Sequence, residues 1–171
     1  MTLEGYKKVV GKLSGGIRAI ALVSAADVTG AEYAQGVCTE IKLAEGKAFA
    51  GYEFKEGEAV YTEEMSVRHG VAKVRHTITF AIERPDSASA AAAARLAEAS
   101  AEGMVAIVTT NSRVSFVVGY SEKFGKEQPL RLTTTALTTG RSTADDTTET
   151  LTLVSEDDRK APVYTGSTAQ Q

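Results

Sequence analysis

The fold is decided by residues 60–84, which read VYTEEMSVRHGVAKVRHTITFAIER. Apolar and polar residues alternate on both sides of His69 and Gly70, and this period of two is typical of half-buried β-strands. Glycine readily takes the positive φ that a two-residue hairpin turn needs. The pattern therefore predicts an antiparallel hairpin that turns at His69 and Gly70.

This turn determines which residues of the two strands stand opposite each other. The pairs expected on the apolar face are Val67–Ala72, Met65–Val74, Glu63–His76 and Tyr61–Ile78. The pairs expected on the other face are Ser66–Lys73, Glu64–Arg75 and Thr62–Thr77. One face is apolar and the other is polar and charge-paired, so the register is self-consistent. A strand histidine opposite a carboxylate is more often a structural pair than a general base.

Other segments alternate in the same way. Strands are expected at residues 17–26, 37–43, 104–110, 113–120, 130–137 and 150–154. Asn111 and Ser112 form a plausible turn between the third and fourth of these segments. The expected register of this second hairpin is Ile107 opposite Phe116 and Val105 opposite Val118.

Residues 87–102 have a different character. They contain five consecutive alanines and other strong helix formers, and Gly103 follows them. Pro85 ends the preceding strand, and Asp86 or Ser87 is a suitable N-terminal cap. The segment is therefore predicted to be a helix that lies close to a sheet, with a low-complexity linker as the alternative.

Together these elements predict one mainly β (α+β) domain over residues 1–171. We expect an antiparallel β-sandwich or small barrel over about residues 15–156, with the alanine-rich helix at about 87–102 packed against it. Residues from about 157 to 171 are polar and are expected to form a tail.

Composition excludes several classes of function. The chain of 171 residues has a formal net charge of −3, and its basic residues are scattered among acidic ones. Tight nucleic-acid binding needs clustered Lys and Arg, so it is not expected. No apolar run reaches the length of a membrane-spanning helix. The first residues lack the order of a secretory signal, so we expect synthesis and retention in the cytoplasm.

The residue types that carry chemistry form no familiar motif. Cys38 is the single cysteine and lies in an alternating segment, which favours a structural role. The acidic residues at 145–149 and 156–158 do not have the spacing of an EF-hand loop. The sequence contains no nucleophile elbow and no complete phosphate-binding loop. We therefore expect no enzyme activity, no cofactor and no metal site.

Residues 44–58 contain three glycines and are more apolar than a free loop. The aromatic residues of this region are Phe49, Tyr52 and Phe54, with Tyr61 just beyond it. These four side chains are buried either in the chain's own core or in a neighbouring copy. The second alternative makes them candidates for an oligomer interface, because open sheet edges invite pairing with another copy.

The order of elements resembles the tail-tube (major tail) proteins of long-tailed bacteriophages and the related tubes of contractile injection systems. Strands, one helix after Pro85, then a hairpin and two late strands carry this resemblance over about residues 17–154. The segments VVGYSEKFG (117–125), PLRL (129–132) and TTGRST (138–143) add to it.

The resemblance implies a β-sandwich packed against its helix, hexameric rings and a stacked tube through which DNA passes without adhering. It also implies other virion proteins as partners, a place in the virion after synthesis in the host cytoplasm, and an inter-ring contact made by residues 44–58.

Three alternatives stay open. The chain could be another virion protein, such as a head–tail connector, head-decoration or tail-terminator subunit. It could be a non-enzymatic module that binds a ligand or partner, with residues 44–58 at the mouth of a β-barrel. An enzyme would need a site built around His76 and Glu63.

Overall fold

The computed structural model describes residues 3–8, 11, 14–83 and 86–168 as two β-sheets and one α-helix, α1 (Ser87–Glu102). The strands are β1 (Ile17–Ser24), β2 (Val28–Ala34), β3 (Val37–Leu43), β4 (Ala50–Tyr52), β5 (Ala59–Arg68), β6 (Val71–Glu83), β7 (Met104–Thr110), β8 (Ser115–Val118), β9 (Arg131–Thr138), β10 (Thr148–Asp157) and β11 (Val163–Tyr164). A short 3-10 turn, η1 (Ala25–Asp27), follows β1.

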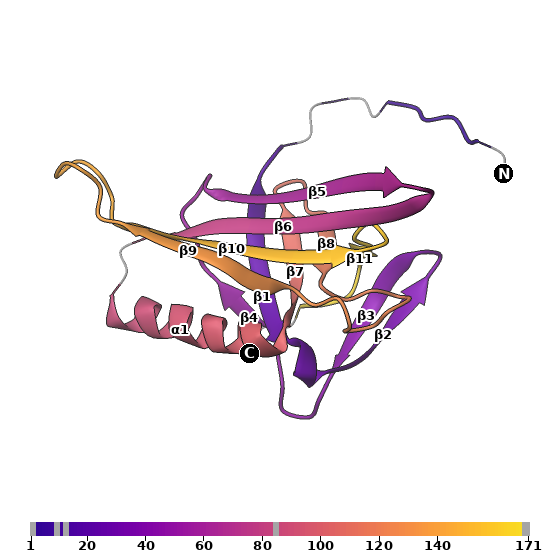
Figure 1. Cartoon of the computed structure of the whole chain (residues 1–171), viewed down its shortest axis with the longest axis horizontal. Helices are drawn as coiled ribbons and strands as arrows, with labels where there is room; N and C mark the ends of the chain where they lie inside the picture. Colours follow the sequence, from indigo (N-terminus) through magenta and orange to yellow (C-terminus); the bar gives the residue numbers. More distant parts are fainter. Residues whose placement is uncertain (1–2, 9–10, 12–13, 84–85, 169–171) are drawn as a thin grey trace.

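The sheets form two layers. One layer is a four-stranded sheet of order β5-β6-β10-β9, and the other is a seven-stranded sheet of order β2-β3-β11-β8-β7-β1-β4. Helix α1 lies on the same side of the four-stranded sheet as the seven-stranded sheet (Figure 1). The predicted mainly β fold with one helix is confirmed. Both sheets stay open, so the molecule is a sandwich-like pair of sheets and not a barrel.

Strands β5 and β6 form the predicted hairpin. His69 has a φ of 50° and Gly70 a φ of 78°, which matches a type I′ turn. Every predicted residue pair of this hairpin occurs in the structure. Val74, Ile78 and Phe80 are fully buried on the face toward the second layer.

The second hairpin is shifted by one residue from its predicted register. Ile107 lies opposite Val117 instead of Phe116, because the turn takes residues 111–114 and not two residues. Arg113 has a φ of 63°, and the Thr110 amide donates a hydrogen bond of 2.9 Å to the Val114 carbonyl. Both faces of β7 are buried, so alternation gave no preference for one register over the other.

Strands β2 and β11 were not predicted, and β4 lies within residues 44–58, where a short strand was one interpretation. β2 pairs with β3, β4 pairs with β1, and β11 lies between β3 and β8. The two-residue β11 corrects the predicted tail, because Tyr164 is buried and the sandwich extends beyond residue 156. Residues 84, 85 and 169–171, which include the strand stop expected at Pro85 and the end of the tail, lie outside the described residues.

Helix α1 has the predicted bounds. The Asp86 carboxylate accepts a hydrogen bond of 2.8 Å from the Ser89 amide, and the Asp86 amide donates one of 2.7 Å to the Ser89 hydroxyl. Leu96 is buried against the sheets. The Arg131 guanidinium donates to the Ala101 carbonyl at 2.6 Å and so ties the end of the helix to β9. The alanine tract is therefore a packed helix and not a linker.

Strand β1 separates two apolar clusters, because alternate side chains point to opposite faces. Ile20 and Leu22 face the cluster between the two layers, where Phe80 also lies. Val23 faces a second cluster, covered by β2, β3 and the segment before β4. Cys38 is fully buried in the second cluster, in accord with a structural role, and burial raises the pKa of its thiol.

A backbone crossing joins the two layers beside Gly119. Met104 and Leu130 exchange two backbone hydrogen bonds of 2.9 Å and 2.8 Å there. A Cβ atom on Gly119 would lie 2.5 Å from the Met104 carbonyl oxygen and 2.9 Å from the Leu130 nitrogen. Gly119 also has a φ of 89°, so only glycine fits this crossing without strain.

We predict that Gly119→Ala lowers the free energy of unfolding by about 3 kcal/mol, the sum of a positive-φ cost and a backbone clash. Gly36→Ala is the matched control, because Gly36 has a φ of 79° with no atom near the new Cβ. Its expected cost is about 1 kcal/mol. Urea unfolding followed by circular dichroism measures both. Equal costs would show that the crossing tolerates a side chain.

Candidate functional site

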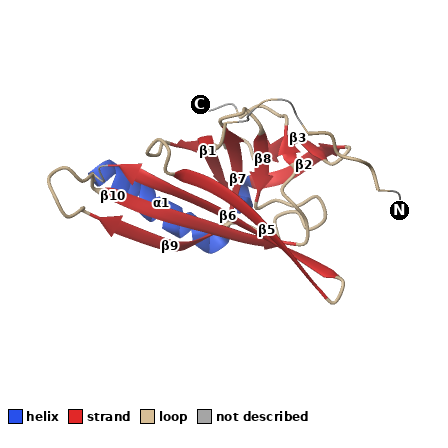
Figure 2. Cartoon of the chain, turned by 90° about the horizontal axis from the view of Figure 1, so that it is seen from above, coloured by secondary structure: helices blue, strands red, loops and turns tan. Residues whose placement is uncertain are grey.

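The outer face of the four-stranded sheet is mainly polar. Each strand contributes threonine to it, including Thr62, Thr77, Thr152 and Thr134. At one end of the face the Lys73 ammonium lies 2.7 Å from a Glu156 carboxylate oxygen. No other element of the described chain covers this face (Figure 2). It is therefore a broad solvent-facing surface with balanced charge.

The two edges of this sheet are open. Within the described residues, no strand pairs with the outer edge of β5 or of β9. Residues 134–138 of β9 contain no charged residue, and Leu137 is 62% exposed. Natural proteins usually protect exposed edges with charge, proline or bulges. A bulge is present near the start of β9, but the rest of its edge is regular and uncharged.

The end of the β5–β6 hairpin, residues 65–73, is named the hairpin tip here. Strand β10 stops pairing with β6 at Val74, so the tip extends beyond the rest of the sheet (Figure 2). Met65, Val67 and Val71 are 48%, 63% and 69% exposed. Large exposed apolar side chains on a projecting element indicate a contact surface.

The aromatic residues proposed from the sequence lie against the chain's own core. Phe49 is buried in the second cluster, whereas Tyr52 and Phe54 pack edge-on against Phe80 with ring centroids 6.2 Å and 6.5 Å away. Tyr61 packs against His76. The chain's own core therefore buries Phe49 and partly covers the other three side chains.

The exposed residues of the hairpin tip and Leu137 were missed by the sequence analysis. The alternation of β5 assigns Met65 and Val67 to the same face as Tyr61, which is partly buried. Whether a position on that face is covered depends on how far the opposite layer and β10 extend. The extent of those elements is set by the tertiary structure, so a local sequence pattern cannot predict it.

A buried polar cluster connects the hairpin to the end of the chain. The Tyr61 hydroxyl lies 2.8 Å from His76 Nδ1 and 3.1 Å from Glu63 Oε2. His76 Nε2 donates a hydrogen bond of 3.1 Å to the Arg159 carbonyl, and the Ala161 amide donates one of 2.8 Å to Glu63 Oε2. Burial, and then the neighbouring Glu63 carboxylate, raise the pKa of Tyr61.

This geometry gives His76 a structural role. Its ring is only 3% exposed, and both nitrogens have partners within the fold. A carbonyl oxygen only accepts, so Nε2 carries a proton that it donates to the Arg159 carbonyl. The cluster fastens the segment before β11 to the hairpin. The predicted structural pairing of Glu63 and His76 agrees with this arrangement.

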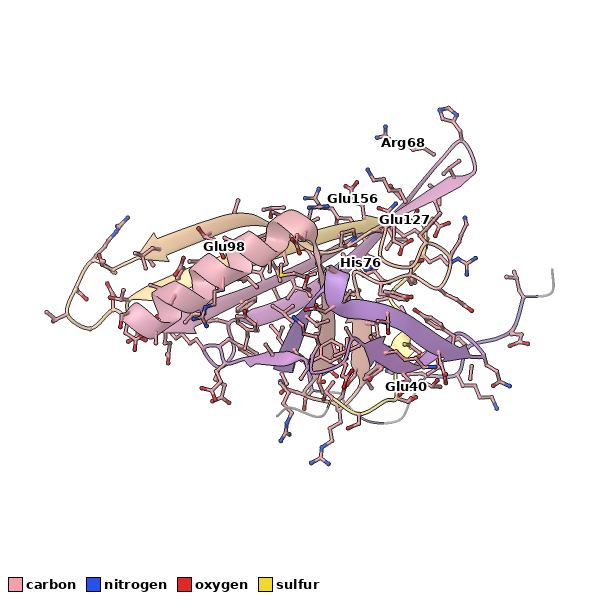
Figure 3. The ribbon with its side chains drawn as sticks, turned by 90° about the horizontal axis from the view of Figure 1, so that it is seen from below. Glu40, Arg68, His76, Glu98, Glu127 and Glu156 are labelled. Carbon is pink, nitrogen blue, oxygen red and sulfur yellow. The ribbon has the colours of Figure 1, made fainter. Side chains whose placement is uncertain are left out.

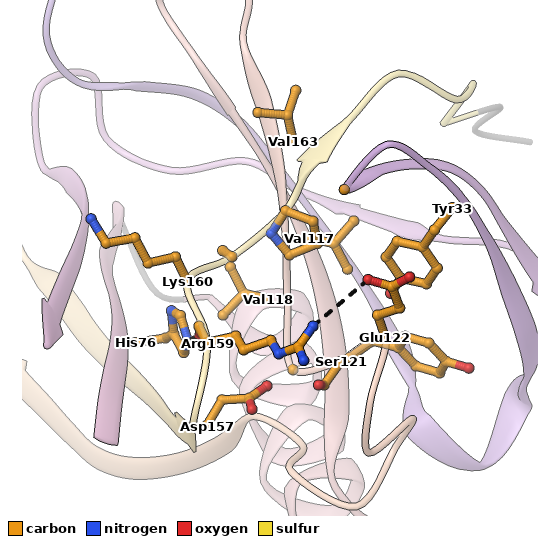
Figure 4. A pocket seen from close by; sticks show the side chains of 15 residues that line it. Tyr33, His76, Val117, Val118, Ser121, Glu122, Asp157, Arg159, Lys160 and Val163 are labelled. Carbon is orange, nitrogen blue, oxygen red and sulfur yellow. Dashed lines mark hydrogen bonds and ion pairs between the residues drawn. The ribbon is translucent and has the colours of Figure 1, made fainter. Parts of the chain in front are cut away.

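A cavity of about 340 Å³ lies beside this cluster, between residues 117–122 and 157–163 (Figure 4). The Arg159 guanidinium and the Glu122 carboxylate face each other across it at 4.0 Å. Burial raises the pKa of the half-buried Asp157 carboxyl at its wall. A cavity of this size can hold a small molecule. Its charged side chains Arg159 and Glu122 already lie close to each other.

We predict that Tyr61→Phe lowers the free energy of unfolding by about 2 kcal/mol, because it leaves the buried His76 Nδ1 and the Glu63 carboxylate without the Tyr61 hydroxyl as a partner. The ring packing is kept, so the change isolates the hydroxyl. Tyr6→Phe removes an exposed hydroxyl and should change stability by less than about 0.5 kcal/mol. Thermal unfolding of both variants tests this, and an unaltered Tyr61→Phe protein would refute the linking role of the cluster.

The described residues contain no group of three or more His, Cys, Asp or Glu side chains placed to share a metal ion. In the part of the chain that the structure describes, no helix has the length and apolar character that a membrane crossing needs. Comparison of the chain with protein-family models, curated proteins and solved structures found no match.

Proposed function

We propose that this chain is a structural subunit that joins copies of itself into rings, as a phage tail-tube protein does. The observation that carries the proposal is the pair of open edges on the four-stranded sheet. The β9 edge is regular and uncharged over residues 134–138, which favours pairing with another chain, whereas β5 carries Glu63, Glu64 and Arg68. The resemblance of element order to tail-tube proteins supports the same function.

The two edges are suited to pair with each other between copies. Neighbouring strands of this sheet are antiparallel, so β5 and β9 run in opposite directions. When one copy is rotated onto the next, β9 of the first and β5 of the second therefore meet as an antiparallel pair. Such a head-to-tail contact closes into a ring when the rotation divides a full turn. Sheet twist favours this closure.

In such a ring the threonine-rich face lines the channel. Helix α1 and the seven-stranded sheet cover the opposite face of the four-stranded sheet, so they form the outer wall. The lining then combines threonine hydroxyls with the paired Lys73 and Glu156 and with Glu64 and Arg75, which stand opposite each other. A surface without a basic cluster does not neutralise phosphates, so DNA would pass without adhering. The chain's net charge of −3 acts in the same direction.

Other virion subunits that form a single ring, such as a connector or tail terminator, would use the same lateral contact. They differ from a tail tube in whether rings stack. A module that binds a small molecule is the second candidate function, and the cavity of about 340 Å³ favours it. That module would stay monomeric and would show protection around the cavity when its ligand binds.

We predict that the purified protein forms uniform rings or tubes in negative-stain electron micrographs as its concentration rises. Leu137→Lys should abolish them, because it places a charge on the edge of β9 that would otherwise pair. Leu3→Lys makes the same change at an exposed leucine outside both sheets and should leave assembly intact. Monomers alone across the series, or rings unaffected by Leu137→Lys, would contradict the proposal.

A further inference from the structure

An open groove lies at the end of β5 opposite to the hairpin tip. The groove has a volume of about 960 Å³ and is formed by the start of β1, by β4 and by residues 53–57. Strand β5 begins just after Gly57 and runs ten residues to the tip. At about 3.3 Å per residue, tip and groove are roughly 30 Å apart. They therefore cannot meet within one chain.

The groove combines apolar and charged side chains with an accessible backbone. Ile20, Tyr52 and Phe54 line it, together with four glycines that have no side chain to block approach: Gly15, Gly16, Gly51 and Gly57. The hairpin tip has an exposed valine on each of its faces, because Val67 points to one and Val71 to the other. A two-sided apolar element buries more surface in a groove than on a flat face.

The charges of the groove and of the hairpin tip also favour a contact between them. Glu53 and Glu56 line the groove, and neither has an ion-pair partner among the described residues. Arg18 is the one cation among the lining residues, and the adjacent Lys55 is already paired with Glu58 and Asp146 at 3.2 Å and 3.1 Å.

Residues 65–73 contain Arg68, His69 and Lys73 and no acidic residue. Arg68 stands at the far end of the hairpin, well away from the body of the molecule (Figure 3). Its guanidinium has no carboxylate partner within the described chain, so it is available to Glu53 or Glu56 of another molecule.

We propose that the hairpin tip of one copy docks in the groove of a second copy. The hairpin tip and the groove lie at opposite ends of β5, so the contact repeats head to tail along that strand. It differs from the lateral pairing of β5 and β9, which joins copies across the sheet. The inference rests on the proposed function, as the contact that holds successive rings together.

The direct test is a cysteine pair across the contact. Val67→Cys combined with Glu56→Cys, oxidised at high concentration and run on a non-reducing gel, should give a ladder of covalent multimers. Each single variant should stop at dimers, because it offers one exposed thiol beside the buried Cys38. A double variant that also stops at dimers would overturn the inference.

A charge exchange tests the polar half of the contact. In the Val67→Cys, Glu56→Cys chain, Arg68→Glu should reduce the yield of the ladder at least tenfold, and the further change Glu53→Arg should restore it. Lys126→Glu, an equal charge change on an exposed loop, should leave the yield unchanged. Loss in Arg68→Glu without rescue by Glu53→Arg would contradict the pairing of Arg68 with Glu53.

The two contacts fail in distinguishable ways. Single rings that never stack, together with no ladder, would refute tip docking and leave the lateral pairing intact. A ladder from linear chains without rings would support tip docking and refute the proposed ring. Tubes that Arg68→Glu and a second tip variant, Val67→Asp, both leave unchanged would refute tip docking even though rings stack.

Discussion

The structure depends on the turn at His69 and Gly70, where two successive residues have positive φ. This turn sets the register of β5 and β6, and a shift of one residue would move every side chain to the opposite face. In the observed register Val74, Ile78 and Phe80 reach the core, whereas Lys73, Arg75 and Thr77 face outward. Strand β10 then pairs with β6 from Glu83 to Val74, and β9 adds to β10.

One consequence is a sheet with a covered face and an open face. Helix α1 and the seven-stranded sheet bury the inner side, so the outer side and both edges are left to solvent or to another molecule. The hairpin is longer than its neighbour β10, so its tip carries apolar residues beyond the core. The proposed lateral pairing and the proposed tip docking both rest on this difference in strand length and coverage. The cluster of Tyr61, Glu63 and His76 fastens the chain end without using either surface.

Much of the fold was predictable because local signals agreed with tertiary structure. The alternating pattern and Gly70 predicted the register of the β5–β6 hairpin. Asp86, the alanines and Gly103 predicted helix α1. The register of β7 and β8 was wrong because both faces of β7 are buried and Arg113 lengthens the turn. Strand β11 has two residues, too few for a period. The sequence predicted that the candidate aromatic residues are buried, but not which surface buries them. That surface, and the exposure of Met65 and Leu137, depend on elements far away in the sequence.

The most direct test is hydrogen–deuterium exchange of the edge strands at low and high protein concentration. If copies pair through the sheet edges, amides of β5 and β9 become protected as concentration rises, while those of β6 and β10 are protected throughout. Residues 3–8 should exchange freely at both concentrations. Exchange in β5 and β9 that does not depend on concentration, at concentrations where assembly is expected, would contradict the account.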